Sequence, residues 1–111
     1  MSDTQQRIKK LVDDNRVLLF MKGTRDYPMC GFSMRAVQVI KALGVPFETV
    51  NVLEDNEVRE GVKQFSSWPT IPQLYIDGQF VGGSDIVYEM YQSGELQKLV
   101  DSIPKQDSAS T

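Results

Sequence analysis

Five consecutive apolar residues, Val17–Met21, form the feature that most restricts the fold of this chain. A strand with one solvent-exposed face alternates apolar and polar residues, whereas an unbroken apolar run is typical of a strand buried on both faces. The run is far shorter than the roughly 20 residues that a membrane-spanning helix needs. We therefore expect a strand within a sheet that carries helices on both sides.

The rest of the chain supplies such helices and three more strands. Apolar residues at helical spacing predict helices over 4–15, 31–43, 55–65, 84–92 and 96–103. The stripe that we expect the second of these helices to bury comprises Met34, Val37, Ile40 and Leu43. β-branched and aromatic residues predict strands over 47–52, Gln73–Ile76 and 79–81. The dipeptide Asp77-Gly78 between the last two strands is the strongest short signal for a hairpin.

The order of these elements predicts one fold class. An early strand–helix–strand unit gives two parallel strands through a right-handed crossover, and the hairpin adds two antiparallel strands. The compact solution is an α/β domain with one four-stranded mixed sheet flanked by helices. We expect this domain to span 1–103, with a disordered tail over 104–111, because the polar segment after Pro104 has no apolar residues to bury.

Charge and length restrict the partners and the compartment. The 111 residues allow one domain, and 12 Lys and Arg against 15 Asp and Glu give a net charge of −3. This balance argues against nucleic acid or an anionic membrane as the main partner. The first ten residues have no apolar stretch after their charges and do not match a secretory signal, so we expect a cytoplasmic protein.

The chain contains no histidine and one cysteine, Cys30. The missing histidine excludes Ser-His and Cys-His catalysis and imidazole metal sites. A single cysteine excludes an internal disulfide and a CxxC redox pair. Any thiol chemistry must therefore use a second sulfur from outside the chain.

Cys30 stands between a loop and the start of a helix, with Lys22, Arg25 and Arg35 nearby in the sequence. A helix N-terminus and nearby cations favour the thiolate, although a free cysteine is also often an inert buried residue. A thiolate without a partner can exchange with an external thiol or disulfide, or it can ligate a metal centre. A centre with four thiolates would need one cysteine from each of two chains and two small thiols.

Two other segments suggest a groove for a small peptide. In Trp68-Pro69-Thr70-Ile71-Pro72 the Ile71-Pro72 bond is a candidate cis bond, which would leave the backbone of Ile71 free to pair with an extended peptide, although a rigid loop is the simpler reading. We expect Trp68 to serve packing. Ser84 and Asp85 are first of all a helix cap, but a helix N-terminus also binds carboxylates.

Charged residues complete this hypothesis. Asp85 could hold an ammonium group, and Lys22 and Arg59 could hold a second carboxylate if both face the same groove. Such a groove would suit a small zwitterionic peptide that has two carboxylates and one amine.

Four motifs together resemble the monothiol glutaredoxins of the CGFS type over about residues 4–103. They are Lys22-Gly23-Thr24, Cys30-Gly31-Phe32-Ser33, Trp68-Pro69-Thr70-Ile71-Pro72-Gln73 and Gly82-Gly83-Ser84-Asp85. The resemblance implies a thioredoxin fold of the glutaredoxin subclass that binds glutathione. It also implies a [2Fe–2S] cluster across a homodimer, ligated by the cysteine of each subunit and two glutathione thiolates, and a role in assembling clusters and transferring them to client apoproteins.

The resemblance also implies a role for each site residue. Cys30 would be the redox thiol and the cluster ligand, and Lys22 and Arg59 would hold the glycine carboxylate of glutathione. Ile71 would pair its backbone with the cysteinyl unit. Ser84 and Asp85 would take the γ-glutamyl end, the backbone N–H groups meeting its carboxylate and the Asp85 side chain its amine. Gly31 and Phe32 would shape the edge of the site.

The chain departs from the family at two positions. Ser84 stands where many relatives have a second cysteine, and Arg25 stands where relatives often have proline, which we expect to loosen the loop before Cys30.

Three functions compete on these data. The leading hypothesis is a cluster carrier that is a monomer alone and a dimer with cluster. The second is an enzyme, a glutathione-dependent oxidoreductase that works through the single thiol of Cys30. The third is a thioredoxin-fold adaptor with an inert cysteine.

Overall fold

A computed structural model of the chain describes residues 2–103, and the tail expected at 104–111 lies outside them. The helices are α1 (Asp3–Asp14), α2 (Gly31–Leu43), α3 (Asn56–Ser66), α4 (Ser84–Ser93) and α5 (Glu95–Asp101), with a short 3₁₀ turn, η1 (Val52–Glu54), before α3. The strands are β1 (Val17–Met21), β2 (Glu48–Asn51), β3 (Gln73–Ile76) and β4 (Gln79–Gly82). This order confirms the predicted α/β pattern.

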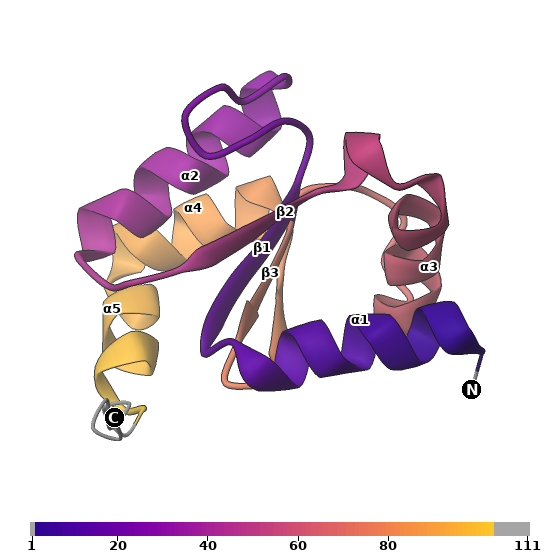
Figure 1. Cartoon of the computed structure of the whole chain (residues 1–111). Coiled ribbons are helices and arrows are strands. Elements are labelled where there is room, and N and C mark those ends of the chain that lie inside the picture. The colour runs from indigo at the N-terminus through magenta and orange to yellow at the C-terminus, as the bar shows by residue number, and fades with distance from the viewer. Residues whose placement is uncertain (1, 104–111) are drawn as a thin grey trace.

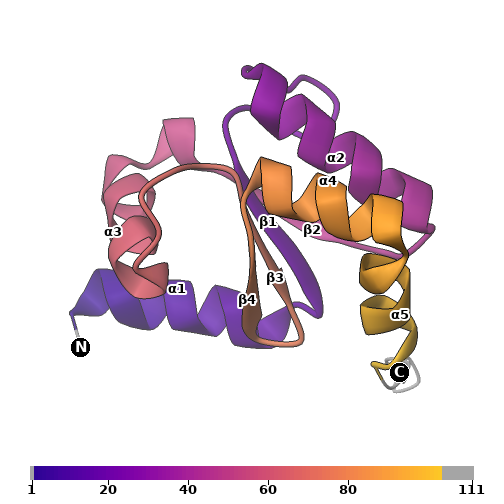
Figure 2. The same ribbon diagram turned by 180° about the vertical axis from the view of Figure 1, so that it is seen from behind.

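The four strands form one mixed sheet in the order β2-β1-β3-β4. Strand β1 runs parallel to β2 and antiparallel to β3, and β3 and β4 form an antiparallel hairpin. Helices α2, α4 and α5 lie on one side of the sheet, and α1 and α3 lie on the other, as both views show (Figures 1 and 2). The predicted four-stranded mixed sheet between helical layers is therefore confirmed.

Strand β1 is buried along its whole length, as its unbroken apolar sequence predicts. Val17, Leu19 and Met21 belong to the core beneath α2, α4 and α5, whereas Leu18 and Phe20 belong to the core beneath α1 and α3. Each face of the strand thus completes a different apolar core, and a polar residue anywhere in β1 would be buried in one of them.

The hairpin and the α1–α3 contact depend on glycine. Asp77 and Gly78 both have positive φ, +52° and +80°, which confirms the predicted two-residue turn. In α3 a Cβ at Gly61 would lie 2.9 Å from the Thr4 Cγ2 atom and 3.0 Å from the Ile8 Cδ1 atom. Gly61 therefore costs α3 some helix propensity but lets α1 pack closely against it.

Two predictions about helices are wrong. Met34 does not belong to the buried stripe of α2, because its side chain is exposed. Each residue turns a helix by about 100°, so Met34 lies on the opposite side of Val37 from Ile40, and the buried side passes through Ser33 and Ala36 instead. The buried residues of α2 are Ser33, Ala36, Val37, Val39, Ile40 and Leu43.

The second error concerns the start of α4. Gly83, rather than Ser84 or Asp85, is the N-cap. Ser84 and Asp85 are the first helical residues, and the first bond of the helix runs from the Val87 N–H to the Gly83 carbonyl. The N–H groups of both residues therefore have no partner within α4.

Among residues 2–103, no helix has the length and apolar content needed to cross a membrane.

Candidate functional site

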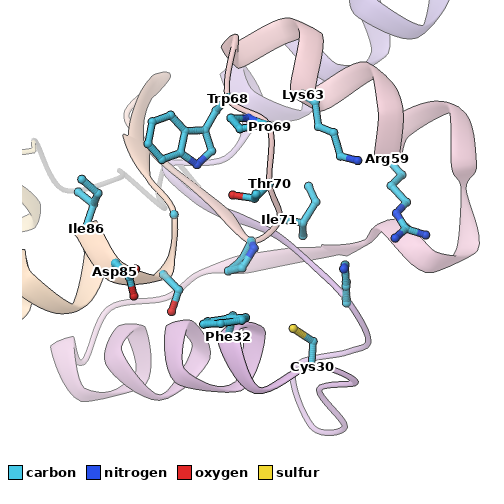
Figure 3. A pocket seen from close by; sticks show the side chains of 14 residues that line it. Cys30, Phe32, Arg59, Lys63, Trp68, Pro69, Thr70, Ile71, Asp85 and Ile86 are labelled. Atoms are coloured by element: carbon cyan, nitrogen blue, oxygen red, sulfur yellow. The ribbon is translucent and has the colours of Figure 1, made fainter.

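A groove of about 440 Å³ opens between the first turn of α2, helix α3, the segment 68–72 and the first turn of α4 (Figure 3). It is lined by all six residues that the sequence analysis selected, namely Lys22, Cys30, Arg59, Ile71, Ser84 and Asp85. Residues separated by more than 60 positions in the sequence thus meet in one site. The condition set for Lys22 and Arg59, that both face the same groove, is met.

Cys30 is the N-cap residue of α2, and its half-buried sulfur points into the groove (Figure 3). Partial burial alone would raise the pKa of this thiol. Hydrogen bonds from the backbone N–H groups of Ser33 and Phe32, the charge of Lys22 and the Ser33 hydroxyl outweigh that effect, so the pKa of Cys30 lies below its ordinary value. The thiolate is therefore favoured at the helix N-terminus, as expected.

Ser33 connects the thiol to the end of β1. Its side chain is fully buried, and its Oγ atom accepts a hydrogen bond of 3.0 Å from the backbone N–H of Lys22. The same hydroxyl helps to lower the pKa of Cys30. Gly31 leaves the other side open, since a Cβ there would find no atom within 4 Å. The sulfur is thus contacted on the side of Ser33 and accessible on the side of Gly31.

The side of the groove formed by α3 and Lys22 is cationic. Lys63, which was not predicted from the sequence, lines the groove with Lys22 and Arg59, and its Nζ atom lies 3.3 Å from Glu60 Oε2. Lys63 follows Arg59 by four residues on α3 and therefore lies on the same side of the helix. This spacing is the signal that could have identified it.

The segment 68–72 forms the wall opposite Cys30. The Ile71-Pro72 bond is cis, as expected, and the Ile71 side chain is buried. Trp68 packs with its ring centroid 5.7 Å from that of Phe80, which agrees with the packing role expected for it. That role is incomplete, because Trp68 also lines the groove beside Thr70, another residue that the sequence analysis missed.

At the α4 end, Ser84 is buried while the Asp85 side chain is 79% exposed. The Oδ1 atom of Asp85 lies 3.6 Å from the Nη1 atom of Arg35. The Arg35 guanidinium also lies 3.8 Å from the centre of the Tyr88 ring. Arg35, which the sequence places near Cys30, is thus paired with Asp85 across the α2–α4 contact.

Arg25, which we expect to loosen the loop before Cys30, contacts Phe47 at the start of the next strand region. The Arg25 side chain donates a hydrogen bond to the carbonyl of Phe47, and its guanidinium lies 4.1 Å from the centre of the Phe47 ring. Backbone hydrogen bonds between Thr24 and Tyr27 close a turn in the same loop. Arg25 therefore ties the loop to the chain just before β2.

Within residues 2–103, three buried side-chain atoms lack a hydrogen-bond partner: Arg59 Nε, Trp68 Nε1 and Ser84 Oγ. All three belong to residues that line the groove. Buried polar groups are nearly always paired, so a concentration of unpaired ones in a single groove makes this groove the candidate ligand site. All three can donate hydrogen bonds, and a ligand with acceptors along the length of the groove would pair them.

Comparisons with known proteins agree with this geometry. The family model "Glutaredoxin" matches residues 17–81. The chain is 56% identical over 99 residues to a monothiol glutaredoxin of Synechocystis, covering 89% of this chain and 92% of that one. It is 57% identical over 94 residues to the chloroplastic monothiol glutaredoxin-S14 of Arabidopsis thaliana, covering 85% of this chain and 54%, about half, of that protein.

Solved structures give the same result. The solution structure of reduced apo GrxS14 from poplar matches with a TM-score of 0.78 at 56% identity, covering 87% of this chain and 89% of that one. The fold is therefore the thioredoxin fold of the glutaredoxins, and the chain belongs to the monothiol glutaredoxin family.

Proposed function

We propose that this protein binds glutathione in the groove and uses it, together with Cys30, to hold a [2Fe–2S] cluster between two copies of the chain. The observation that carries the glutathione part is the presence of three buried unpaired donors in one groove beside a reactive thiol. Glutathione is a tripeptide with a carboxylate at each end, one amine and a thiol, so its acceptors match donors that are spread along the groove.

The groove suggests one orientation for the tripeptide. Lys22 and Arg59 hold the glycine carboxylate, and the backbone of Ile71 pairs with the cysteinyl unit. At the other end, the free N–H groups of Ser84 and Asp85 receive the γ-glutamyl carboxylate. The Asp85 carboxylate then contacts the amine of the γ-glutamyl unit. This amine competes with Arg35 for the Asp85 carboxylate. This orientation carries the glutathione thiol toward Cys30.

The cluster is cargo that the chain cannot hold alone. Among residues 2–103, no group of three or more His, Cys, Asp or Glu side chains could hold a metal ion. A [2Fe–2S] centre takes four thiolates, and each chain supplies one. Two Cys30 thiolates and two glutathione thiolates complete the set. The accessible sulfur and its lowered pKa fit a ligand that is shared with a second copy.

From this we infer the biological role and the assembly state. The protein receives clusters and transfers them to client apoproteins, because a cluster held partly by small exchangeable thiols can be released by ligand exchange. It is a monomer without cluster and a homodimer with it.

The lowered pKa of Cys30 also favours the second candidate, a glutathione-dependent oxidoreductase. In that reaction the Cys30 thiolate attacks the glutathionyl sulfur of a protein–glutathione disulfide, and the protein sulfur leaves as a thiolate. A second glutathione then attacks the new Cys30–glutathione disulfide. This step restores the Cys30 thiolate and yields glutathione disulfide.

Anaerobic reconstitution tests the leading proposal. The protein is incubated with iron, sulfide and glutathione, and each component is omitted in turn. We expect visible absorption of a [2Fe–2S] centre only in the complete mixture. A colourless protein that still turns over a glutathione mixed disulfide would instead establish the oxidoreductase.

A further inference from the structure

Trp68 carries a donor that the packing of its ring does not explain. Its Nε1 atom is buried and has no hydrogen-bond partner among residues 2–103. The ring packs against Phe80, yet Figure 3 shows the indole nitrogen on the side of the ring that faces the interior of the groove. An indole that served packing alone would leave this N–H either in water or paired with a protein acceptor.

The position of Gly83 locates this donor within the groove. A Cβ at Gly83 would lie 3.2 Å from Trp68 Nε1 and 3.4 Å from the Pro72 carbonyl oxygen. Gly83 is the N-cap of α4 and has a φ of −91°, which any residue adopts. The lack of room for a Cβ atom, rather than backbone strain, therefore favours glycine at this position. The indole N–H lies directly beside the helix start at which the backbone N–H groups of Ser84 and Asp85 are free.

The donors at this end all need an acceptor, and their convergence at a helix N-terminus favours one that carries negative charge. They comprise two backbone N–H groups, the buried unpaired Ser84 hydroxyl and the indole N–H. An indole N–H can donate but cannot accept. An ammonium or an amide N–H at this position would leave it unpaired, whereas a carboxylate oxygen would satisfy it.

We propose that the Trp68 indole N–H donates to the ligand carboxylate at the α4 end of the groove, and that Trp68 thereby selects ligands that carry this carboxylate. The inference rests on the proposed glutathione binding, in which this group is the γ-glutamyl carboxylate. Trp68 thus has two roles, since one face of its ring packs against the β4 residue Phe80 while its N–H edge recognises the ligand.

The chain offers a direct probe, because Trp68 is its one tryptophan and gives a single indole N–H resonance. The uniformly ¹⁵N-labelled protein is titrated under reducing conditions with three tripeptides. They are glutathione, 4-aminobutanoyl-Cys-Gly, which lacks the γ-glutamyl carboxylate, and glutaryl-Cys-Gly, which keeps that carboxylate but lacks the amine. We expect glutathione and the glutaryl analogue to shift the indole proton downfield and the aminobutanoyl analogue to leave it in place.

An isosteric variant measures the contribution of this one donor. Replacing Trp68 with 3-benzothienylalanine exchanges the N–H for sulfur and keeps the shape of the ring. We expect glutathione affinity to fall about tenfold, the size of one hydrogen bond to a charged group. Affinity for the aminobutanoyl analogue should not change. Gly83→Ala, which places a methyl group beside Nε1, should also weaken glutathione binding.

The outcomes separate this inference from the proposed function. The inference is overturned if glutathione shifts the Ser84 and Asp85 amide resonances but leaves the indole resonance unmoved, while glutathione binding itself stands. The same holds if the isosteric variant binds glutathione as tightly as the natural protein. If no resonance in the groove responds to glutathione, the proposed function fails as well. The resonance test uses the unaltered protein, so a variant that does not fold cannot obscure the result.

Discussion

The two ends of the groove present hydrogen-bond donors of different physical kinds. At the α3 end the donors are the long side chains of Lys22, Arg59 and Lys63, which carry full charges on flexible stems. At the α4 end they are short and fixed, because the N–H groups of Ser84 and Asp85 are held by the helix itself. Full charges attract over roughly 8 Å at physiological ionic strength and are screened by salt. Fixed N–H groups act only in contact. If the groove binds glutathione as proposed, the α3 end therefore supplies attraction and the α4 end supplies selectivity.

The largest expected effect lies between these two ends, at the thiol. Cys30→Ser should abolish cluster binding and thiol exchange, because no other sulfur nucleophile exists in the chain. The fold should persist, because Cys30 occupies the N-cap position of α2 and serine is a favoured N-cap residue. Visible absorption after reconstitution and circular dichroism measure the two results. A variant that still binds cluster with unchanged absorption would show that the ligand assignment is wrong.

A charge removed at the α3 end should weaken binding in a manner that depends on salt. Arg59→Gln should lower glutathione affinity about tenfold at low ionic strength, or about 1.4 kcal/mol, with a smaller loss at high salt. Isothermal titration calorimetry at several salt concentrations measures this. Lys10→Gln is the matched control, because it removes the same charge from the outside of α1, where Lys10 pairs with Asp14 at 2.8 Å. Equal effects of the two variants would refute a specific contact at Arg59.

Ser33 controls the thiol rather than either end of the groove. Ser33→Ala removes one donor to the Cys30 thiolate, so the pKa of Cys30 should rise toward its ordinary value. The iodoacetamide reaction rate, which follows the thiolate, should then reach its midpoint at a higher pH than in the unaltered protein. Ser93→Ala at the exposed end of α4 is the control. An unchanged midpoint would show that the backbone N–H groups hold the thiolate without the hydroxyl.

The smallest effect is expected at the Ser84 hydroxyl, at the α4 end. Ser84→Ala should lower glutathione affinity only about twofold to threefold, because the helix N–H groups remain in place. The loss should be the same at low and high salt, in contrast to Arg59→Gln. Calorimetry under identical conditions makes that comparison. A loss above tenfold would mean that the hydroxyl, rather than the backbone, provides most of the binding at this end.

The sequence predicts the parts of the molecule that depend on local chemistry. The apolar run in β1, the Asp77-Gly78 turn and the position of Cys30 at a helix start were all identified from neighbouring residues. The two errors about helices are small: Met34 lies just outside the buried side of α2, and α4 begins one residue earlier than expected, after Gly83. The features that the sequence did not reveal are contacts between distant segments. Gly83 lies beside Trp68, and Arg35 pairs with Asp85 although 50 positions separate them. No short motif reveals which long side chains will meet once the sheet is assembled.

Native mass spectrometry of the reconstituted protein tests most directly the claim that two chains and two tripeptides complete one site. We expect a complex of two chains, two iron atoms, two sulfide ions and two glutathione molecules, in which four thiolates ligate the iron. The complex should return to monomer when iron is chelated or glutathione is removed by dialysis. A cluster-loaded monomer, or a dimer that keeps its cluster without glutathione, would contradict the account.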